Sequence, residues 1–109
     1  MSLIKNDLLS NLVPSEFFLS QNYPNPFREK TIIKFCIPYL TRVKLEILNA
    51  ENKLIKKLLD EEKPAGSYEV ELDVTNCHSN KGGKFEEEIY FCSLKAGNYM
   101  KTKKMILSK

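Results

Sequence analysis

The sequence has little of what catalysis or membrane insertion requires. It contains one histidine and no tryptophan among 109 residues, and no apolar run approaches the roughly 18 residues of a membrane span. A single histidine leaves few acid–base groups for an active site, which disfavours a small enzyme. The net charge of +3 is small, and Lys and Arg are interspersed with Asp and Glu, which argues against a dedicated nucleic-acid-binding protein.

The first ten residues, MSLIKNDLLS, lack the apolar core of a secretion signal. We therefore expect that an exported protein containing this sequence carries its signal further upstream. Residues 1–14 are expected to be a linker or residues added by cloning, and residues 15–109 to form one domain. The hydrophobic content of 42% and the charged content of 28% are typical of a globular domain.

Short segments of alternating apolar and polar residues cover most of the chain. The clearest are TIIKFCI at 31–37, RVKLEIL at 42–48 and SYEVELD at 67–73. A repeat of two residues is typical of strands with one buried face. We expect further strands at 17–19, 53–59, 89–94 and 99–107. Segment 53–59, KLIKKLL, also fits a helix, but its neighbours favour a strand at the edge of a sheet.

Turn-forming residues separate these segments, at 49–52, 63–66, 80–83 and 95–98. About seven short strands joined by such turns predict an all-β fold, an antiparallel immunoglobulin-like β-sandwich. Its core between the sheets is expected to contain Phe35, Leu45, Ile47, Tyr68, Val70, Tyr90 and Leu94.

The segment SQNYPNPF, at 20–27, breaks the alternation. Each of its two prolines fixes φ, lacks a backbone donor and pushes the preceding residue toward an extended conformation. Its asparagines can bond to the nearby backbone and stabilise turns. We expect a stiff corner that pairs with no strand, with Tyr23 and Phe27 filling one end of the core. The residues of this corner are Asn22, Tyr23, Pro24, Asn25, Pro26 and Phe27.

The segment FFLSQNYPNPFREKTIIKFCIP resembles the opening of the type A C-terminal sorting domains of the type IX, or Por, secretion system. VKLEILNAENKLIKKL, PAGSYEVELD, IYFCSLKAG and TKKMILSK resemble the later segments of that family, in order, so the resemblance runs from Glu16 to Lys109. A weaker resemblance links the chain to flagellar hook-capping immunoglobulin-like modules. Three positions depart from the family pattern: Asn52 and Glu88 stand where Gly is usual, and Leu72 stands where Trp is usual.

The resemblance implies a non-catalytic module, without a cofactor, that directs an upstream cargo protein across the outer membrane. Its partners would be components of the type IX translocon and a sortase-like protease. The protein would then be secreted or held at the cell surface. The alternative is a structural immunoglobulin-like accessory or adhesion domain of a larger secreted protein.

The terminal segment YMKTKKMIL is expected to be an edge strand blunted by lysines, with Met105 and Leu107 docked in the sheet. Under the resemblance, the same strand is where the translocon recognises the domain. The residues assigned to this recognition are Lys103, Lys104, Met105, Leu107 and Lys109.

No other residues form a convincing chemical site. Cys36 and Cys92 lie on strands that immunoglobulin domains bridge, but Cys36 is expected to point outward and Cys92 inward, which favours free thiols. Cys77-His78 has no second ligand pair for zinc and no orienting third group for catalysis. NKGGK lacks the ending of a phosphate-binding loop, and the acidic residues at 60–62 and 86–88 lack calcium-loop spacing.

Overall fold

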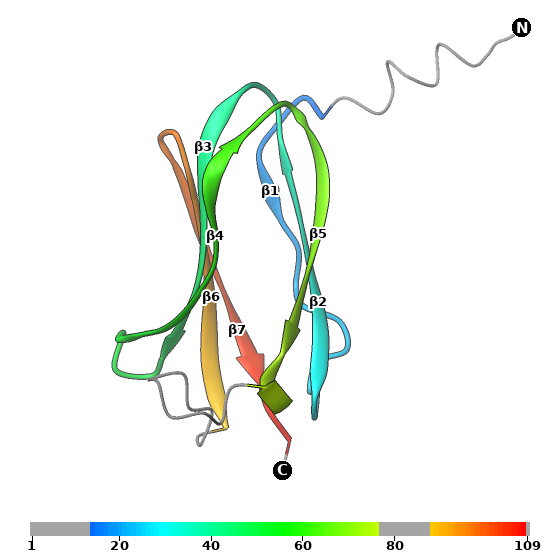
Figure 1. Ribbon diagram of the computed structural model, residues 1–109, viewed down its shortest axis with the longest axis vertical. Helices are drawn as coiled ribbons and strands as arrows, with labels where there is room; N and C mark the ends of the chain where they lie inside the picture. The colour runs from blue at the N-terminus through cyan, green and yellow to red at the C-terminus, as the bar shows by residue number, and fades with distance from the viewer. Residues whose placement is uncertain (1–13, 77–87, 109) are drawn as a thin grey trace, which may run out of the picture.

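The computed structural model describes residues 14–76 and 88–108, which fold into an antiparallel β-sandwich (Figure 1). This confirms the predicted fold class. The chain order is β1 (Phe18–Leu19), β2 (Lys30–Ile37), β3 (Thr41–Asn49), β4 (Leu54–Lys63), β5 (Gly66–Asp73), a 3-10 turn η1 (Val74–Asn76), β6 (Ile89–Ala96) and β7 (Tyr99–Ile106). No helix in these ranges is long and apolar enough to cross a membrane.

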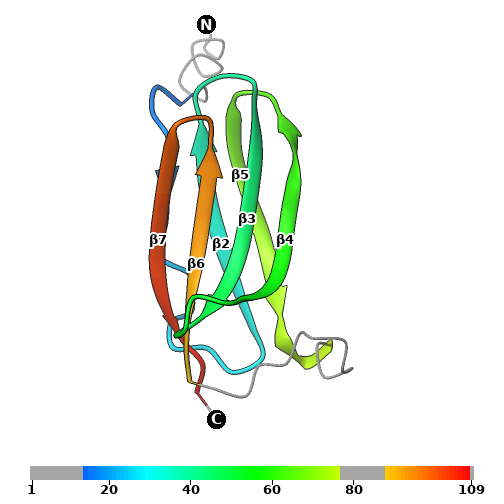
Figure 2. The same ribbon diagram turned by 90° about the vertical axis from the view of Figure 1, so that its left-hand side faces the viewer.

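The strands form two sheets, in the orders β1-β2-β5 and β4-β3-β6-β7. Figure 2 shows the four-stranded sheet with β7 and β4 at its two margins. The prediction of an edge strand at 53–59 is therefore confirmed, although β4 is longer and extends to Lys63. Its register with β3 shifts at Leu45/Glu46 and again at Ile47/Leu48. These irregularities explain why KLIKKLL does not alternate cleanly, because each extra residue reverses the facing of the side chains that follow.

The core between the sheets is made of the inward side chains of these strands. Five of the residues predicted for it are buried: Phe35, Leu45, Ile47, Tyr90 and Leu94. Tyr68 and Val70 pack against this core but are half-buried, because β5 lies at the edge of its sheet. The ring of Tyr68 still stacks on Phe35, with 5.3 Å between centroids.

The turn between β3 and β4 explains one departure from the family pattern. Asn52 adopts the left-handed conformation, with φ 68°, which asparagine tolerates better than most residues other than glycine. The side-chain oxygen of Asn49 accepts hydrogen bonds from the backbone N–H groups of Glu51 and Lys53, at 2.9 Å each. Asn52 therefore serves in the place of the usual glycine, as the sequence predicted.

The two described cysteines are free thiols, as expected. Cys36 is half-buried on β2, with its sulfur 3.4 Å from the Ser67 hydroxyl, whereas Cys92 is buried in the core. Burial raises the pKa of the Cys92 thiol to about 12, so this thiol is neutral in the folded protein. The expectations for residues 1–13, Cys77-His78, the turn at 80–83, the acidic residues 86 and 87, and Lys109 concern positions outside the described residues.

Candidate functional site

The corner, residues 22–27 extended by the preceding Gln21, connects the two sheets. Tyr23 exchanges two backbone hydrogen bonds with Ile32 of β2, at 2.9 and 3.0 Å. Phe27 forms a parallel bridge with Leu107, just after β7. The expectation that this segment pairs with no strand was therefore wrong. The prolines remove donors at two positions, but Tyr23 and Phe27 keep theirs, and these N–H groups are the ones that bond to the sheets.

Asn22 is the buried polar centre of the corner. Its side-chain N–H2 donates to the carbonyl of Pro24 at 3.1 Å and to the hydroxyl of Thr31 at 3.0 Å. Its oxygen accepts a bond of 2.9 Å from the Gln21 side chain. The Thr31 hydroxyl in turn donates to the Pro24 carbonyl at 2.8 Å. This network fastens the corner to β2 and satisfies a side chain that would be costly to bury alone.

The corner also closes part of the outer edge of β7. The Gln21 side chain donates to the carbonyl of Lys104 at 2.6 Å, and the N–H of Ile106 donates to the Asn25 side-chain oxygen at 2.9 Å. Phe27 N–H donates to the Ile106 carbonyl at 3.0 Å, and Ser108 N–H to the Phe27 carbonyl at 2.7 Å. The corner and the terminal strand, predicted as separate features, therefore form one site.

The two aromatic residues of the corner have opposite environments. Phe27 is 1% exposed and closes one end of the core, as predicted. Tyr23 is 79% exposed, so its predicted place in the core was wrong. The reason is its pairing with Ile32: residues paired across strands share a face of the sheet, and Ile32 lies on the face opposite to the buried Ile33.

On the terminal strand, Met105 and Leu107 are buried, whereas Lys104 is exposed. Lys103 is half-buried and shares the phase of Met105, so it lies on the side of β7 that faces the other sheet. Lys103 is therefore less exposed than a lysine that blunts an edge strand is expected to be. Lys109 lies outside the described residues. Gln21 and Thr31 contribute to the site and were missed, because nothing in the sequence relates Gln21 to a strand 83 residues away.

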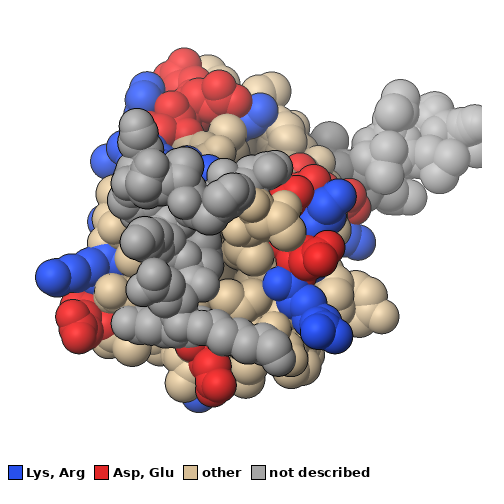
Figure 3. Space-filling view, turned by 60° about the horizontal axis from the view of Figure 1, so that its bottom comes forward, with Lys and Arg blue, Asp and Glu red and all other residues tan. Residues whose placement is uncertain are grey.

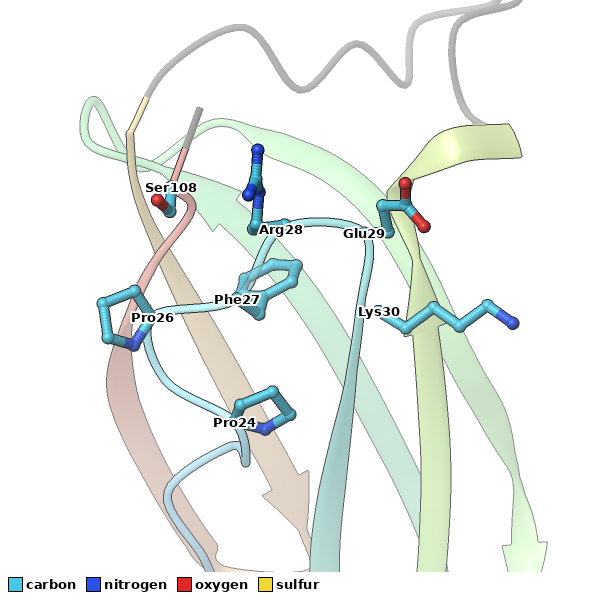
Figure 4. A pocket seen from close by; sticks show the side chains of 7 residues that line it. All are labelled: Pro24, Pro26, Phe27, Arg28, Glu29, Lys30 and Ser108. Atoms are coloured by element: carbon cyan, nitrogen blue, oxygen red, sulfur yellow. The ribbon is translucent and has the colours of Figure 1, made fainter.

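A shallow open hollow lies beside the corner. Its lining residues, drawn in Figure 4, are Pro24, Pro26, Phe27, Arg28, Glu29, Lys30 and Ser108. The charged side chains among them point in different directions and do not converge on one point (Figure 4). At this end of the sandwich, positive and negative side chains are interspersed (Figure 3). Among the described residues there is also no group of three His, Cys, Asp or Glu that could hold a metal ion. In the part of the chain that the structure describes, the hollow therefore shows neither converging charged groups nor a metal-binding cluster.

Comparisons with known proteins agree with this geometry. The family described as the secretion system C-terminal sorting domain matches residues 21–108. A search of curated proteins found no match. The fold is similar to part of the crystal structure of dimeric latent PorU from Porphyromonas gingivalis, with a TM-score of 0.54 and 20% identity. That match covers 84% of this chain and 9% of the PorU chain. The family match covers the corner and the terminal strand together, and the chain belongs to the family of secretion system C-terminal sorting domains.

Proposed function

We propose that residues 15–109 are a sorting module that directs an upstream cargo protein through the type IX translocon to the cell surface or the medium. The observation that carries this proposal is the joining of the corner to the terminal strand by four hydrogen bonds, within the segment that matches the sorting family. The module has no catalytic role of its own, and residues 1–14 act as the linker to the cargo.

In this proposal, cleavage in the linker and contact with the translocon take place at opposite ends of the sandwich. The described part of the chain starts at one end of the sandwich, and β7 ends at the opposite end (Figure 1). A sortase-like protease that cuts in the linker would therefore work far from the terminal strand. The translocon would contact that strand through Lys103, Lys104, Met105, Leu107 and Lys109. Met105 and Leu107 contribute by anchoring the strand, since both are buried.

The proposal is tested by fusing the chain to a secreted reporter in a host with a type IX system. Deletion of Met105–Lys109 should leave the reporter in the periplasm, because it removes the anchors of β7. A second fusion, with Lys103, Lys104 and Lys109 changed to Gln, keeps those anchors and tests the charge alone. Deletion of residues 1–10 is the matched control and should not reduce export.

Export is measured as the fraction of reporter activity outside the cell, with total activity as the check that the reporter is folded. Normal export of the fusion that lacks Met105–Lys109 would refute the sorting function. The accessory or adhesion domain would then be the better description.

A further inference from the structure

The corner closes only part of the outer edge of β7. The backbone groups of Lys104 and Ile106 that bond to the corner point away from β6. Because β7 pairs with β6 without a register shift, Met100 and Thr102 have their N–H and C=O groups on the same outer side. Within residues 14–76 and 88–108, these groups have no hydrogen-bond partner. We call the outer side of residues 100–103 the open edge.

The neighbouring strand β1 leaves this edge open. It pairs with β2 in the other sheet, and it meets β7 through side chains. The rings of Phe17 and Tyr99 stack with 5.0 Å between centroids, and the backbone N–H of Leu19 bonds to the Tyr99 hydroxyl. These contacts hold the two sheets together at the start of β7, but they supply no partner for the backbone of Met100 or Thr102.

The charge around the open edge has one sign. All charged residues of β6 and β7 are lysines: Lys95, Lys101, Lys103 and Lys104. The ion pairs between described residues involve strands β2 to β5, and none includes one of these four lysines. Lysines on an edge strand oppose pairing with a second copy of the same strand, because like charges would then face each other. The same lysines favour a strand that carries carboxylates.

We propose that the open edge accepts an extended acidic segment of a partner protein as an additional strand of the sheet. This proposal rests on the proposed function and identifies the partner's segment by its chemistry. The backbone of the added strand bonds to Met100 and Thr102, which gives affinity. Its carboxylates on one face lie near Lys104, and those on the other face lie near Lys101 and Lys103. This alternation selects acidic segments over other extended ones.

The test measures amide hydrogen exchange by NMR on the 109-residue chain. The probe is a synthetic peptide of at least seven residues that repeats Glu-Glu-Val-Val, so that carboxylates lie on both faces of the added strand. In the free protein, the amides of Met100 and Thr102 should exchange rapidly, and those of Lys101 and Lys103, which face β6, slowly. With the acidic peptide, exchange at Met100 and Thr102 should slow by tenfold or more. A peptide with Lys in place of Glu, and one with a central Pro, should leave both amides fast.

Two variants separate the backbone from the charge. Thr102→Pro removes one outward donor and spares the hydrogen bonds to β6, and proline is tolerated on edge strands. It should abolish peptide binding and block export of the reporter fusion. Lys101, Lys103 and Lys104 changed to Gln should weaken binding at least tenfold and remove most of its salt dependence. The matched control, with Lys44, Lys53 and Lys56 changed to Gln, should bind the peptide normally.

The outcomes distinguish this inference from the sorting function itself. Protection of amides on β4 or β5, or no protection anywhere, would overturn the inference. So would normal export of the Thr102→Pro fusion while the deletion of Met105–Lys109 blocks export, and in that case the sorting function would stand. Normal export of both fusions would refute the sorting function. If the Thr102→Pro chain does not fold, the triple Gln variant and its control decide the result.

Discussion

The four-stranded sheet has two edges, and they are protected in different ways. β4 carries both signs of charge: Asp60 pairs with Arg42 at 2.9 Å and with Lys57 at 3.3 Å, and Lys63 pairs with Glu61 at 3.0 Å. Its register with β3 is also irregular. β7 pairs regularly with β6, and every charged side chain that it carries is a lysine. Part of its edge is closed by a corner that lies about 80 residues earlier in the chain.

The difference shows that the charges on the β4 edge are paired within β4 and with the adjacent strand β3. The backbone groups on the β7 edge are instead covered by a segment that is distant in the sequence. Mixed charges and irregular pairing make an edge a poor template for another strand. The β7 edge has neither feature, and beyond the corner the outward backbone groups of Met100 and Thr102 have no partner among the described residues. A fold that needed only solubility would gain nothing from this asymmetry. Under the proposed function, the asymmetry would leave one strand near the C-terminal end available for recognition.

The largest effect is expected from removing the anchor of the corner. Phe27→Ala empties a site at the end of the core and should lower the free energy of unfolding by about 3–5 kcal/mol. The matched control is Tyr23→Ala in the same corner, which should cost about 0.5 kcal/mol or less because its ring is exposed. Urea unfolding measures both. Similar losses for the two variants would mean that Tyr23 contributes to packing and that its exposed position is wrong.

A smaller loss of stability is expected when the asparagine that caps each edge is replaced by alanine. Asn25→Ala removes the acceptor for the Ile106 N–H and should cost about 0.5–1.5 kcal/mol. Amide hydrogen exchange should become faster only on β7, at Ile106. Asn49→Ala is the matched control, because it removes the acceptor for Glu51 and Lys53 in the turn before β4. Faster exchange at Ile106 in the Asn49 variant would show that the two edges are not independent.

The sequence predicted the strands correctly wherever one face of a strand is buried and the other is exposed to solvent. Strands β2, β3 and β5 were predicted from their clear alternation, because most of their inward residues are apolar. Asn52 was also predicted correctly, because its left-handed conformation is a local property of the turn. The family resemblance added the sorting function, which no pattern of alternation contains.

The errors share one cause, which is dependence on contacts that are remote in the sequence. The exposure of Tyr23 follows from its register with Ile32. The pairing of the corner follows from the position of β7, whose backbone supplies partners at Lys104 and Ile106. The length of β4 follows from its irregular pairing with β3. The register shifts place extra residues in β4, and these residues interrupt the alternation from which its length could have been predicted. Alternation reports which face of a strand is buried, and it does not report the strand's partner.

The smallest effect is expected from acid acting on the β4 edge. Partial burial alone would raise the pKa of Asp60, but hydrogen bonds from Lys57 and Arg42 and their positive charges outweigh it, and the pKa lies below the ordinary value of 3.8. The ionised form is therefore favoured in the folded state. Its contribution to stability is present above the ordinary pKa and is lost as the pH falls through the lower, folded pKa.

Asp60→Asn should accordingly lower stability slightly at neutral pH, and the difference from the unmodified chain should vanish in strong acid. Lys101→Gln on β7 is the matched control and should show no such change, because Lys101 forms no ion pair with a described residue. Urea unfolding at a series of pH values measures both differences, and carbon NMR of the Asp60 carboxyl gives its pKa directly. A carboxyl that titrates at or above 3.8 would contradict the pairing of Asp60 with Arg42 and Lys57. The claim that the β4 edge neutralises its own charge would then fail.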